Sequence, residues 1–365
     1  MKINFLKTDY ISILEKVDKV NPLRYAFNRN YIDGDVSRLS PYISRGVLST
    51  DQIFKNLVNR GFDLNKIEKF IQELAWRDYW QLVWQEKDIN RDIKNPQSDI
   101  LSYGVSKNIV DHNTGIKALD TAIKELYKTG YVHNHLRMYI AALSVNVAKN
   151  HWKVPAKWMY YHLLDGDWAS NSLSWQWVAG TNSSKKYIAN QDNINKYTRT
   201  QQKKTYLDID YSELSEILQP ETLKELTSFD FEVVYPKSDL FNINDGKTVC
   251  IYNYYNLDPN WRKESNYHRI LLIEPSVIDL QPIGEKAMNF MLSLSKNIEG
   301  IKVFVGEFDE LPIGKSQVIY KEHPNNHNYK GIKDERDWMS SVKGYHSSFF
   351  SFWKKAKKEI FRKYA

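Results

Sequence analysis

Two carboxylates, an amide and two indoles crowd into one short stretch of the sequence, DGDWASNSLSWQW. These side chains belong to Asp165, Asp167, Asn171, Trp175 and Trp177. Asp and Asn hydrogen-bond the local backbone and lower helix stability away from caps. Their crowding beside tryptophans therefore favours a site for a polar ligand with a flat ring. A helix N-cap followed by an aromatic core segment explains the same residues, so the stretch alone leaves both interpretations open.

A second chemical group lies on the helix predicted over residues 66–87. Glu73, Trp76, Arg77 and Trp80 are spaced three and four apart and share one helix face. Indoles beside an ion pair suit a cavity wall better than a solvated face. The alternative is an exposed Glu73–Arg77 pair worth about 0.3–0.5 kcal/mol, with the tryptophans packed as core.

Residues 37–41, SRLSP, place two hydroxyls and a guanidinium within four residues and so offer donors for a phosphate. His133 and His135 are two residues apart at a predicted helix start, without a third ligand nearby. Zinc sites need more ligands than this. We therefore predict no metal site.

Several predicted elements must position these residues. Ser49 and Gln52 form a capping box, so a helix should begin near Thr50 and run toward Arg60. Asn134 is expected to cap the helix that carries Arg137 and Met138. The remaining predictions are an amphipathic helix in 1–20, a loop over 88–113, a helix over 116–128 that ends before Gly130, and an aromatic helix over 156–164.

Composition limits the classes of protein that fit. A chain of 365 residues, 42% apolar and 26% charged, suggests two globular domains. The single cysteine, Cys250, excludes a disulfide framework and is expected to be buried on a strand. No signal peptide or long apolar span is evident, so we expect a cytoplasmic protein. The net charge of +7 is compatible with an anionic partner such as nucleic acid.

Four motifs occur in order: SRLSPY (37–42), ELAWRDY (73–79), TGYVHNHLRM (129–138) and DGDWASNSLSWQWVAGT (165–181). Together they resemble the FAD-binding helical domain of the DNA photolyase and cryptochrome family, over about residues 20–200. The resemblance implies FAD as cofactor, and it does not specify which antenna chromophore, if any, the chain binds. The cofactor-binding residues that it implies are Tyr25, Ser37, Arg38, Leu39, Ser40, Arg77, Asn134, Arg137, Asp165, Asp167 and Asn171. In this set Arg137 would pair with Asp165, and Val36 replaces the family's usual threonine.

The resemblance also implies DNA that carries pyrimidine dimers, single- or double-stranded, as the partner. The implied DNA-binding residues are Glu73, Trp76, Asn134, His135, Met138 and Trp177. The implied catalytic residues are Glu73, Asn171 near the flavin, and Trp175 and Trp152 as proximal and middle members of a photoreduction chain. Residues 92–103 lack the distal tryptophan, and Tyr103 is a candidate replacement.

The fold class expected is a mainly α FAD-binding domain followed by a small α/β domain with a parallel sheet. We predict the helical domain at 1–200, a linker at 201–245 and the α/β domain at 246–365, with strands in KTVCIYNY, RILLIEPS, GIKVFVGEF and QVIYKEHP and a helix in GEKAMNFMLSLSKNI. This order resembles a circular permutation of the family, with a reduced antenna domain moved to the C-terminal side. GKS at 314–316 lacks the preceding glycine of a phosphate loop. His323 and His327 are expected to be exposed, and the tail to be a basic amphipathic helix.

Two functions fit these residues. The first is a blue-light-dependent DNA repair lyase that splits cyclobutane pyrimidine dimers. The second is a cryptochrome-like FAD photoreceptor that signals through a protein partner. The set of dimer-contact residues favours the lyase. A structural protein whose aromatics are merely core is the remaining class.

Overall fold

The computed structural model describes residues 6–364, and the part of the predicted first helix before residue 6 lies outside them. The chain forms two compact units. The helical unit comprises Leu23–Val36 and Lys87–Phe231, and the mixed unit comprises Met1–Pro22, Ser37–Glu86 and Glu232–Ala365. Residues 37–86 therefore belong to the same compact unit as residues 232–365. The domain boundaries expected at residues 200 and 245 stay a prediction.

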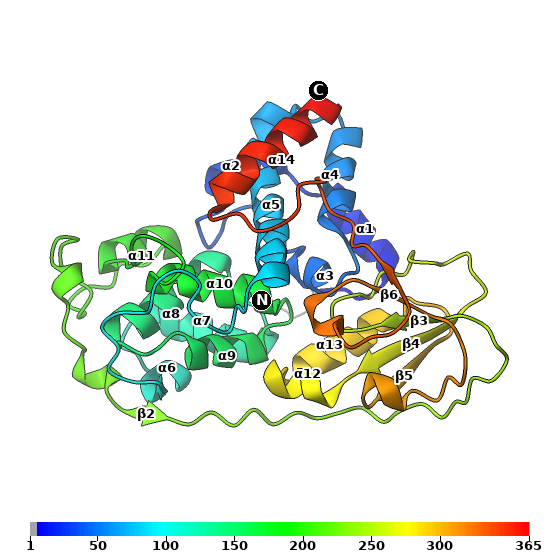
Figure 1. The fold of residues 1–365 in the computed structure, drawn as a ribbon. Helices are drawn as coiled ribbons and strands as arrows, with labels where there is room; N and C mark the ends of the chain where they lie inside the picture. Colours follow the sequence, from blue (N-terminus) through cyan, green and yellow to red (C-terminus); the bar gives the residue numbers. More distant parts are fainter. Residues whose placement is uncertain (1–5, 365) are drawn as a thin grey trace. The chain divides into compact units, whose positions relative to one another are not determined.

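The helical unit is a bundle in which α10 packs against α8 and α9 (Figure 1). Its helices are α6 (Lys107–Val110), α7 (Lys117–Thr129), α8 (Asn134–Ala142), the π-helical turn η1 (Leu143–Val147), α9 (Lys153–His162), α10 (Trp168–Ala179) and α11 (Gln191–Thr198). Helix α2 (Pro22–Asn28) begins at the boundary of this unit. Gly130 ends α7 in the left-handed conformation, as its sequence position predicts.

Residues beyond the predicted helical domain also belong to the helical unit. The strands β1 (Val105–Ser106) and β2 (Leu226–Thr227) pair antiparallel, and the turns η2 (Leu214–Glu216) and η3 (Glu221–Leu223) follow α11. Leu207, Leu214 and Leu223 join the buried core of the bundle. The segment predicted as a linker thus packs on the bundle up to Phe231, because these leucines bury apolar surface there.

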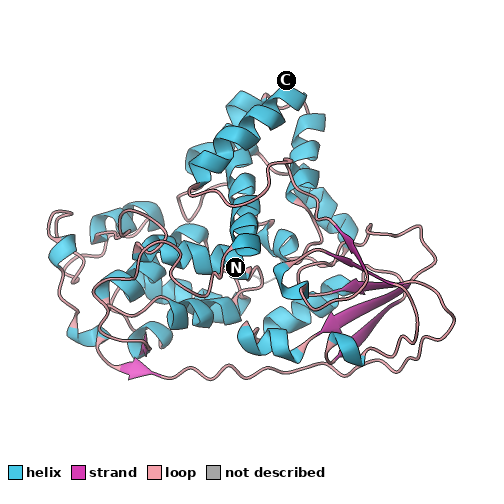
Figure 2. Ribbon diagram, viewed as in Figure 1, coloured by secondary structure: helices cyan, strands magenta, loops and turns pink. Residues whose placement is uncertain are grey.

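The mixed unit contains a five-stranded parallel sheet in the order β5-β4-β3-β6-β7. Figure 2 draws strands in magenta. The strands are β3 (Val249–Tyr252), β4 (His268–Ile273), β5 (Ile301–Val305), β6 (Val318–Lys321) and β7 (Ile332–Asp334), with α12 (Pro275–Leu280), α13 (Glu285–Ser295) and the turns η4 (Phe308–Glu310) and η5 (Pro324–Asn326) between them. All four residues of β3 are buried, Cys250 included, as expected for a central parallel strand covered on both faces. The predicted strands and helix are confirmed, and α12 and β7 are additions that the sequence did not indicate.

The remaining helices of the mixed unit are α1 (Tyr10–Asp18), α3 (Ser40–Ser44), α4 (Thr50–Asn59), α5 (Leu64–Glu86) and α14 (Phe349–Tyr364). The capping box of Ser49 and Gln52 is present at the start of α4. Helix α5 packs against both α4 and α14 (Figure 1). The long helix predicted over 66–87 and the C-terminal amphipathic helix are therefore confirmed.

Candidate functional site

The acidic residues of the 165–177 stretch sit in the turn between α9 and α10 and are almost fully buried. Asp167 is the N-cap of α10 and accepts a hydrogen bond of 2.7 Å from the Ser170 amide. Asp165 forms a 2.8 Å ion pair with the Arg137 guanidinium on α8. Arg137 also donates from Nε to the Val132 carbonyl at 2.9 Å. The turn before α10 is therefore fixed both by its own cap and by a charged bond to α8.

The backbone and the side chain of Asn171 are both held by hydrogen bonds within the helical unit. Asn171 lies one turn beyond Asp167, and its backbone amide donates to the Asp167 carbonyl. Its Nδ2 donates to the Ala156 carbonyl at 2.9 Å, so α9 fixes the carboxamide of a half-buried side chain. An amide held in one orientation can present a defined acceptor to a ligand.

Tryptophans continue from Asn171 through the buried core of the helical unit. Trp175, one turn further along α10, and Trp152 belong to the same buried cluster. The Trp152 indole donates to Asp92 Oδ1 at 2.6 Å. Its neighbour His151 stacks on Tyr103, with ring centroids 5.3 Å apart, and Tyr103 is 72% exposed. Aromatic rings thus lead from the buried Trp152 to the surface, where sequence reasoning expected the replacement for a distal tryptophan.

The start of α8 differs from the sequence prediction by one residue. His133, not Asn134, is the N-cap, because its Nδ1 accepts a 3.1 Å hydrogen bond from the His135 amide. Asn134 is exposed, and Met138 is half-buried. His135 stacks on Tyr197 at 4.7 Å, and burial, reinforced by the Arg29 charge, lowers the pKa of His135 to about 4. His135 is therefore a neutral ring at physiological pH.

Trp177 lies near the C-terminal end of α10, whereas the acidic turn precedes its start. It is half-buried and tilted against Tyr187, with ring centroids 5.7 Å apart. Part of its indole therefore remains open to a flat ligand.

In the mixed unit, the donor-rich segment 37–40 leads into α3. Arg38 adopts a left-handed backbone conformation with φ 52°, which is uncommon for a residue other than glycine. Ser37 Oγ accepts from the Leu39 amide at 3.4 Å, and Leu39 is buried. Tyr25 is half-buried on α2, in the helical unit. Left-handed residues of this kind occur often at ligand sites.

The face of α5 that carries Glu73, Trp76 and Arg77 is covered in part by the chain itself. Trp76 stacks face to face on Phe349 of α14, with centroids 3.8 Å apart and planes 10° apart. The Arg77 guanidinium donates to Ser44 Oγ at 2.9 Å, and Glu73 lies 3.7 Å from the Lys69 ammonium. One face of Trp76 is therefore packed against the chain, as the core alternative expects, and the residue as a whole is half-buried.

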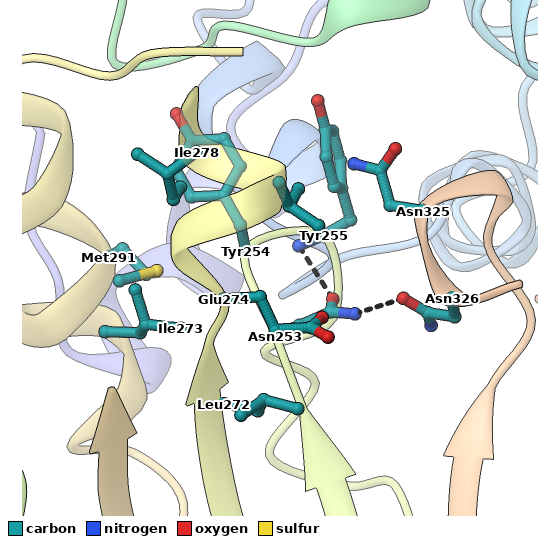
Figure 3. A pocket seen from close by; sticks show the side chains of 11 residues that line it. Asn253, Tyr254, Tyr255, Leu272, Ile273, Glu274, Ile278, Met291, Asn325 and Asn326 are labelled. Carbon is teal, nitrogen blue, oxygen red and sulfur yellow. Dashed lines mark hydrogen bonds between the residues drawn. The ribbon is translucent and has the colours of Figure 1, made fainter. Parts of the chain in front are cut away.

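The carboxyl edge of the sheet holds a small cavity (Figure 3). Asn253, Tyr254, Glu274 and Asn326 are among the residues that line it. Its volume is about 30 Å³, enough for a water molecule, whereas sites for drug-sized ligands have about 300–1,000 Å³. Burial raises the pKa of Glu274, whose carboxylate accepts a hydrogen bond from the Tyr329 hydroxyl.

Side chains of the mixed unit fill this edge, the usual ligand crevice of doubly wound sheets. The fully buried Arg45 guanidinium lies 3.2 Å above the centre of the Tyr254 ring. His323 stacks on Tyr255 at 4.2 Å and is 6% exposed. The expectation that His323 is exposed is therefore wrong, because the ring fills space beside a tyrosine, whereas His327 is exposed as predicted.

Sequence reasoning did not single out Arg45 or Phe349 as partners of the candidate residues. Both contacts join segments more than 200 residues apart, and a single sequence carries no signal of such pairing. Within residues 6–364, no three His, Cys, Asp or Glu side chains gather as a metal site would require. Among the helices that the structure describes, none is long and apolar enough to cross a membrane.

Comparison with known proteins agrees with this picture of the helical part. Residues 70–228 match the family model described as the FAD binding domain of DNA photolyase. A deoxyribodipyrimidine photo-lyase of Alkalihalophilus pseudofirmus is 32% identical over an alignment of 168 residues, gaps included, that covers 42% of this chain and 34% of the relative. The photo-lyase of Buchnera aphidicola is 30% identical over an alignment of 210 residues, which covers 48% of this chain and 43% of the relative.

Solved structures show a weaker likeness. A class III photolyase from Agrobacterium tumefaciens has 21% identity and a TM-score of 0.44, covering 57% of this chain and 54% of that one. A Synechocystis cryptochrome has 19% identity and a TM-score of 0.45, covering 54% of this chain and 44% of that one. The chain thus spans less than half the length of the curated relatives described above.

Proposed function

Because residues 70–228 carry the FAD-binding domain of DNA photolyases, we propose that this chain is a blue-light-dependent lyase that splits cyclobutane pyrimidine dimers. The observation that carries the proposal is the extent of the matched domain. It contains the residues that the sequence resemblance assigns to dimer contact, namely Glu73, Trp76, Asn134, His135, Met138 and Trp177. Three curated relatives at 30–32% identity are deoxyribodipyrimidine photo-lyases.

The donor set of the chain fits FAD. Hydroxyl and guanidinium donors at Ser37, Arg38 and Ser40 suit the diphosphate, and the left-handed Arg38 sets the direction of that loop. In the helical unit, the fixed Asn171 carboxamide suits a ring that carries both donors and acceptors. Asp167 holds the helix start from which Asn171 projects.

A reduced FAD bound here would supply redox chemistry under blue light, namely one electron lent to the dimer and recovered once the two ring bonds have broken, so that the splitting is redox-neutral. The protein residues bind and orient the lesion, which must leave the base stack at a cost of a few kcal/mol. Stacking on an aromatic side chain returns about 1–3 kcal/mol per base. Since Phe349 already covers one face of Trp76, we expect Trp177 to provide much of this stacking. Glu73 would hydrogen-bond the extruded bases.

Electron supply to the cofactor would follow the aromatic rings of the helical unit. Trp175 and Trp152 share one buried cluster, and Tyr103 reaches Trp152 through the stacked ring of His151. Tyr103 is exposed, so its phenolic proton can leave to solvent when the ring is oxidised. This arrangement supports Tyr103 as the terminal member of the chain.

A cryptochrome-like photoreceptor is the second candidate. The stacking of Phe349 on Trp76 favours it, because that contact occupies a ring face that a dimer would otherwise use. A receptor of this kind would bind FAD and photoreduce it, but it would not repair DNA.

The test is an absorption spectrum of the purified protein, followed by a repair assay on irradiated oligothymidine under blue light. We expect a bound flavin and light-dependent loss of dimers. Glu73→Gln should lower repair while retaining flavin, whereas Glu86→Gln, exposed at the end of the same helix, should leave both unchanged. A folded protein that binds FAD and repairs neither single- nor double-stranded DNA would contradict the lyase and favour the receptor.

A further inference from the structure

Helix α14 separates apolar and basic residues onto opposite faces. Its buried residues are Phe349, Phe352, Trp353, Ala356 and Ile360. Its exposed basic residues are Lys354, Lys355, Lys358, Arg362 and Lys363. The sequence of the helix predicts this amphipathic pattern, and the structure shows which face is covered.

The apolar face is firmly docked within the mixed unit. Phe349 stacks on Trp76, and Phe352 stacks on Tyr79 at 5.7 Å. At the middle of the helix, the Glu68 carboxylate accepts from the Trp353 indole and, at 2.7 Å, from the Lys357 ammonium. These contacts hold the helix in one orientation, so the opposite face is presented to solvent as a fixed surface.

This surface concentrates the positive charge of the molecule. Residues 349–364 carry six basic side chains and one acidic one, which amounts to five of the seven net positive charges of the chain. The single acid, Glu359, is engaged by two hydrogen bonds from Ser341. Hydrogen bonds from a neutral serine leave the charge of Glu359 in place, so the basic side chains of the helix outnumber its acidic ones by five.

The basic face starts beside the candidate lesion site. Phe349, the first residue of α14, contacts Trp76, and the adjacent Phe350 is 69% exposed. Cations at residues 354, 358 and 362 follow at four-residue intervals, which in a helix are about 6 Å apart. We propose that this basic face of α14 binds the phosphate backbone of the DNA strand that flanks the lesion. The inference rests on the proposed function, since it assumes that DNA is the partner.

The arrangement fits a nucleic acid better than a membrane. An interfacial helix buries its apolar face in lipid, but the apolar face of α14 is already buried against α5. The surface of α14 that is left for a partner is its basic face, with the exposed ring of Phe350 at the start. Phosphates attract such a row, and an exposed aromatic ring can stack on a base.

The test is the salt dependence of binding to an oligonucleotide, measured by fluorescence anisotropy. Each phosphate contact adds about 0.9 to the slope of log K against log salt for duplex DNA and about 0.7 for single strands. Replacement of Lys354, Lys355, Lys358 and Arg362 by Gln should therefore reduce the slope by about 2–4. A variant with arginine at the three lysines should keep the slope of the wild type.

A matched control is Lys286→Gln, Lys296→Gln and Lys302→Gln, which removes three exposed cations elsewhere in the mixed unit. This control should leave the slope unchanged. An unchanged slope in the α14 variant, with a wild type that repairs dimers, would overturn this inference alone. A wild type that holds FAD but binds no DNA would overturn the proposed function as well. The α14 inference would also be overturned if the α14 variant lost binding to anionic phosphatidylserine vesicles while the salt dependence of its DNA binding stayed unchanged.

Discussion

The ion pair between Arg137 and Asp165 offers a direct test of how the turn before α10 is held. The Asp165 side chain is 2% exposed and the Arg137 side chain 20% exposed. Removal of one partner of a buried pair costs about 3–5 kcal/mol, because the other charge stays buried without it. Since Arg137 is one-fifth exposed, we expect Arg137→Met to cost about 3 kcal/mol, the lower end of that range.

That cost corresponds to a fall in Tm of about 6–12 °C for a folding unit of 150–250 residues. Urea unfolding followed by tryptophan fluorescence, together with calorimetry, measures it. Because the turn also carries Asp167, the N-cap of α10, the variant should bind FAD more weakly, which is measured as flavin retained after gel filtration.

A double-mutant cycle isolates the pair from other effects of the substitution. Arg137→Met combined with Asp165→Asn should be more stable than Arg137→Met alone, because the buried charge is gone. The pair of Lys186 and Asp99 in the same unit, in which the Asp99 side chain is 65% exposed, is the control, and Lys186→Met should cost at most about 1 kcal/mol. If Arg137→Met is no more destabilising than Lys186→Met, the argument that this pair fixes the turn is refuted.

Three further predictions concern other parts of the chain. Trp152→Phe should slow light-driven reduction of bound FAD, followed by flavin absorbance, whereas Trp158→Phe, equally buried, should slow it far less. The pKa of His135 is lowered in the folded state, so the stability that the neutral ring contributes is present above about pH 6.5 and is lost as the pH falls toward 4. His135→Gln should therefore weaken the pH dependence of the urea unfolding midpoint between pH 6.5 and 4. Gly46→Ala should lower the free energy of unfolding in urea by about 2–4 kcal/mol, because the Gly46 backbone is left-handed and the new Cβ would overlap the Tyr255 carbonyl, which follows β3. The control is Gly61→Ala: Gly61 is also left-handed but has open space around it, so this substitution should cost only about 1 kcal/mol.

Local chemistry explains which features the sequence predicts well. The capping box at Ser49, the glycine stop at Gly130 and the alternation of strand and helix after residue 246 depend on neighbours within a few residues, so they can be read without a structure. The Arg137–Asp165 pair was expected only through the family resemblance. Boundaries were less certain, as the cap at His133 in place of Asn134 shows.

The contacts that sequence reasoning missed are long-range. Phe349 reads as one apolar position in an amphipathic helix, and nothing in its neighbours indicates that it stacks on Trp76. His323 was expected at the surface because histidines beside a proline usually lie in exposed loops, yet its ring fills the sheet edge against Tyr255. Such positions are decided by packing density and shape, which depend on segments distant in sequence.

The discontinuous make-up of the mixed unit has a consequence for how the protein is made. Its chain segments are Met1–Pro22, Ser37–Glu86 and Glu232–Ala365, with most of the helical unit synthesised in between. During translation, α5 therefore leaves the ribosome long before α14 exists to cover its aromatic residues. Contacts between distant segments form slowly, and exposed apolar surface on a nascent chain invites aggregation. We expect nascent chains that stop short of α14 to engage chaperones through this uncovered face of α5.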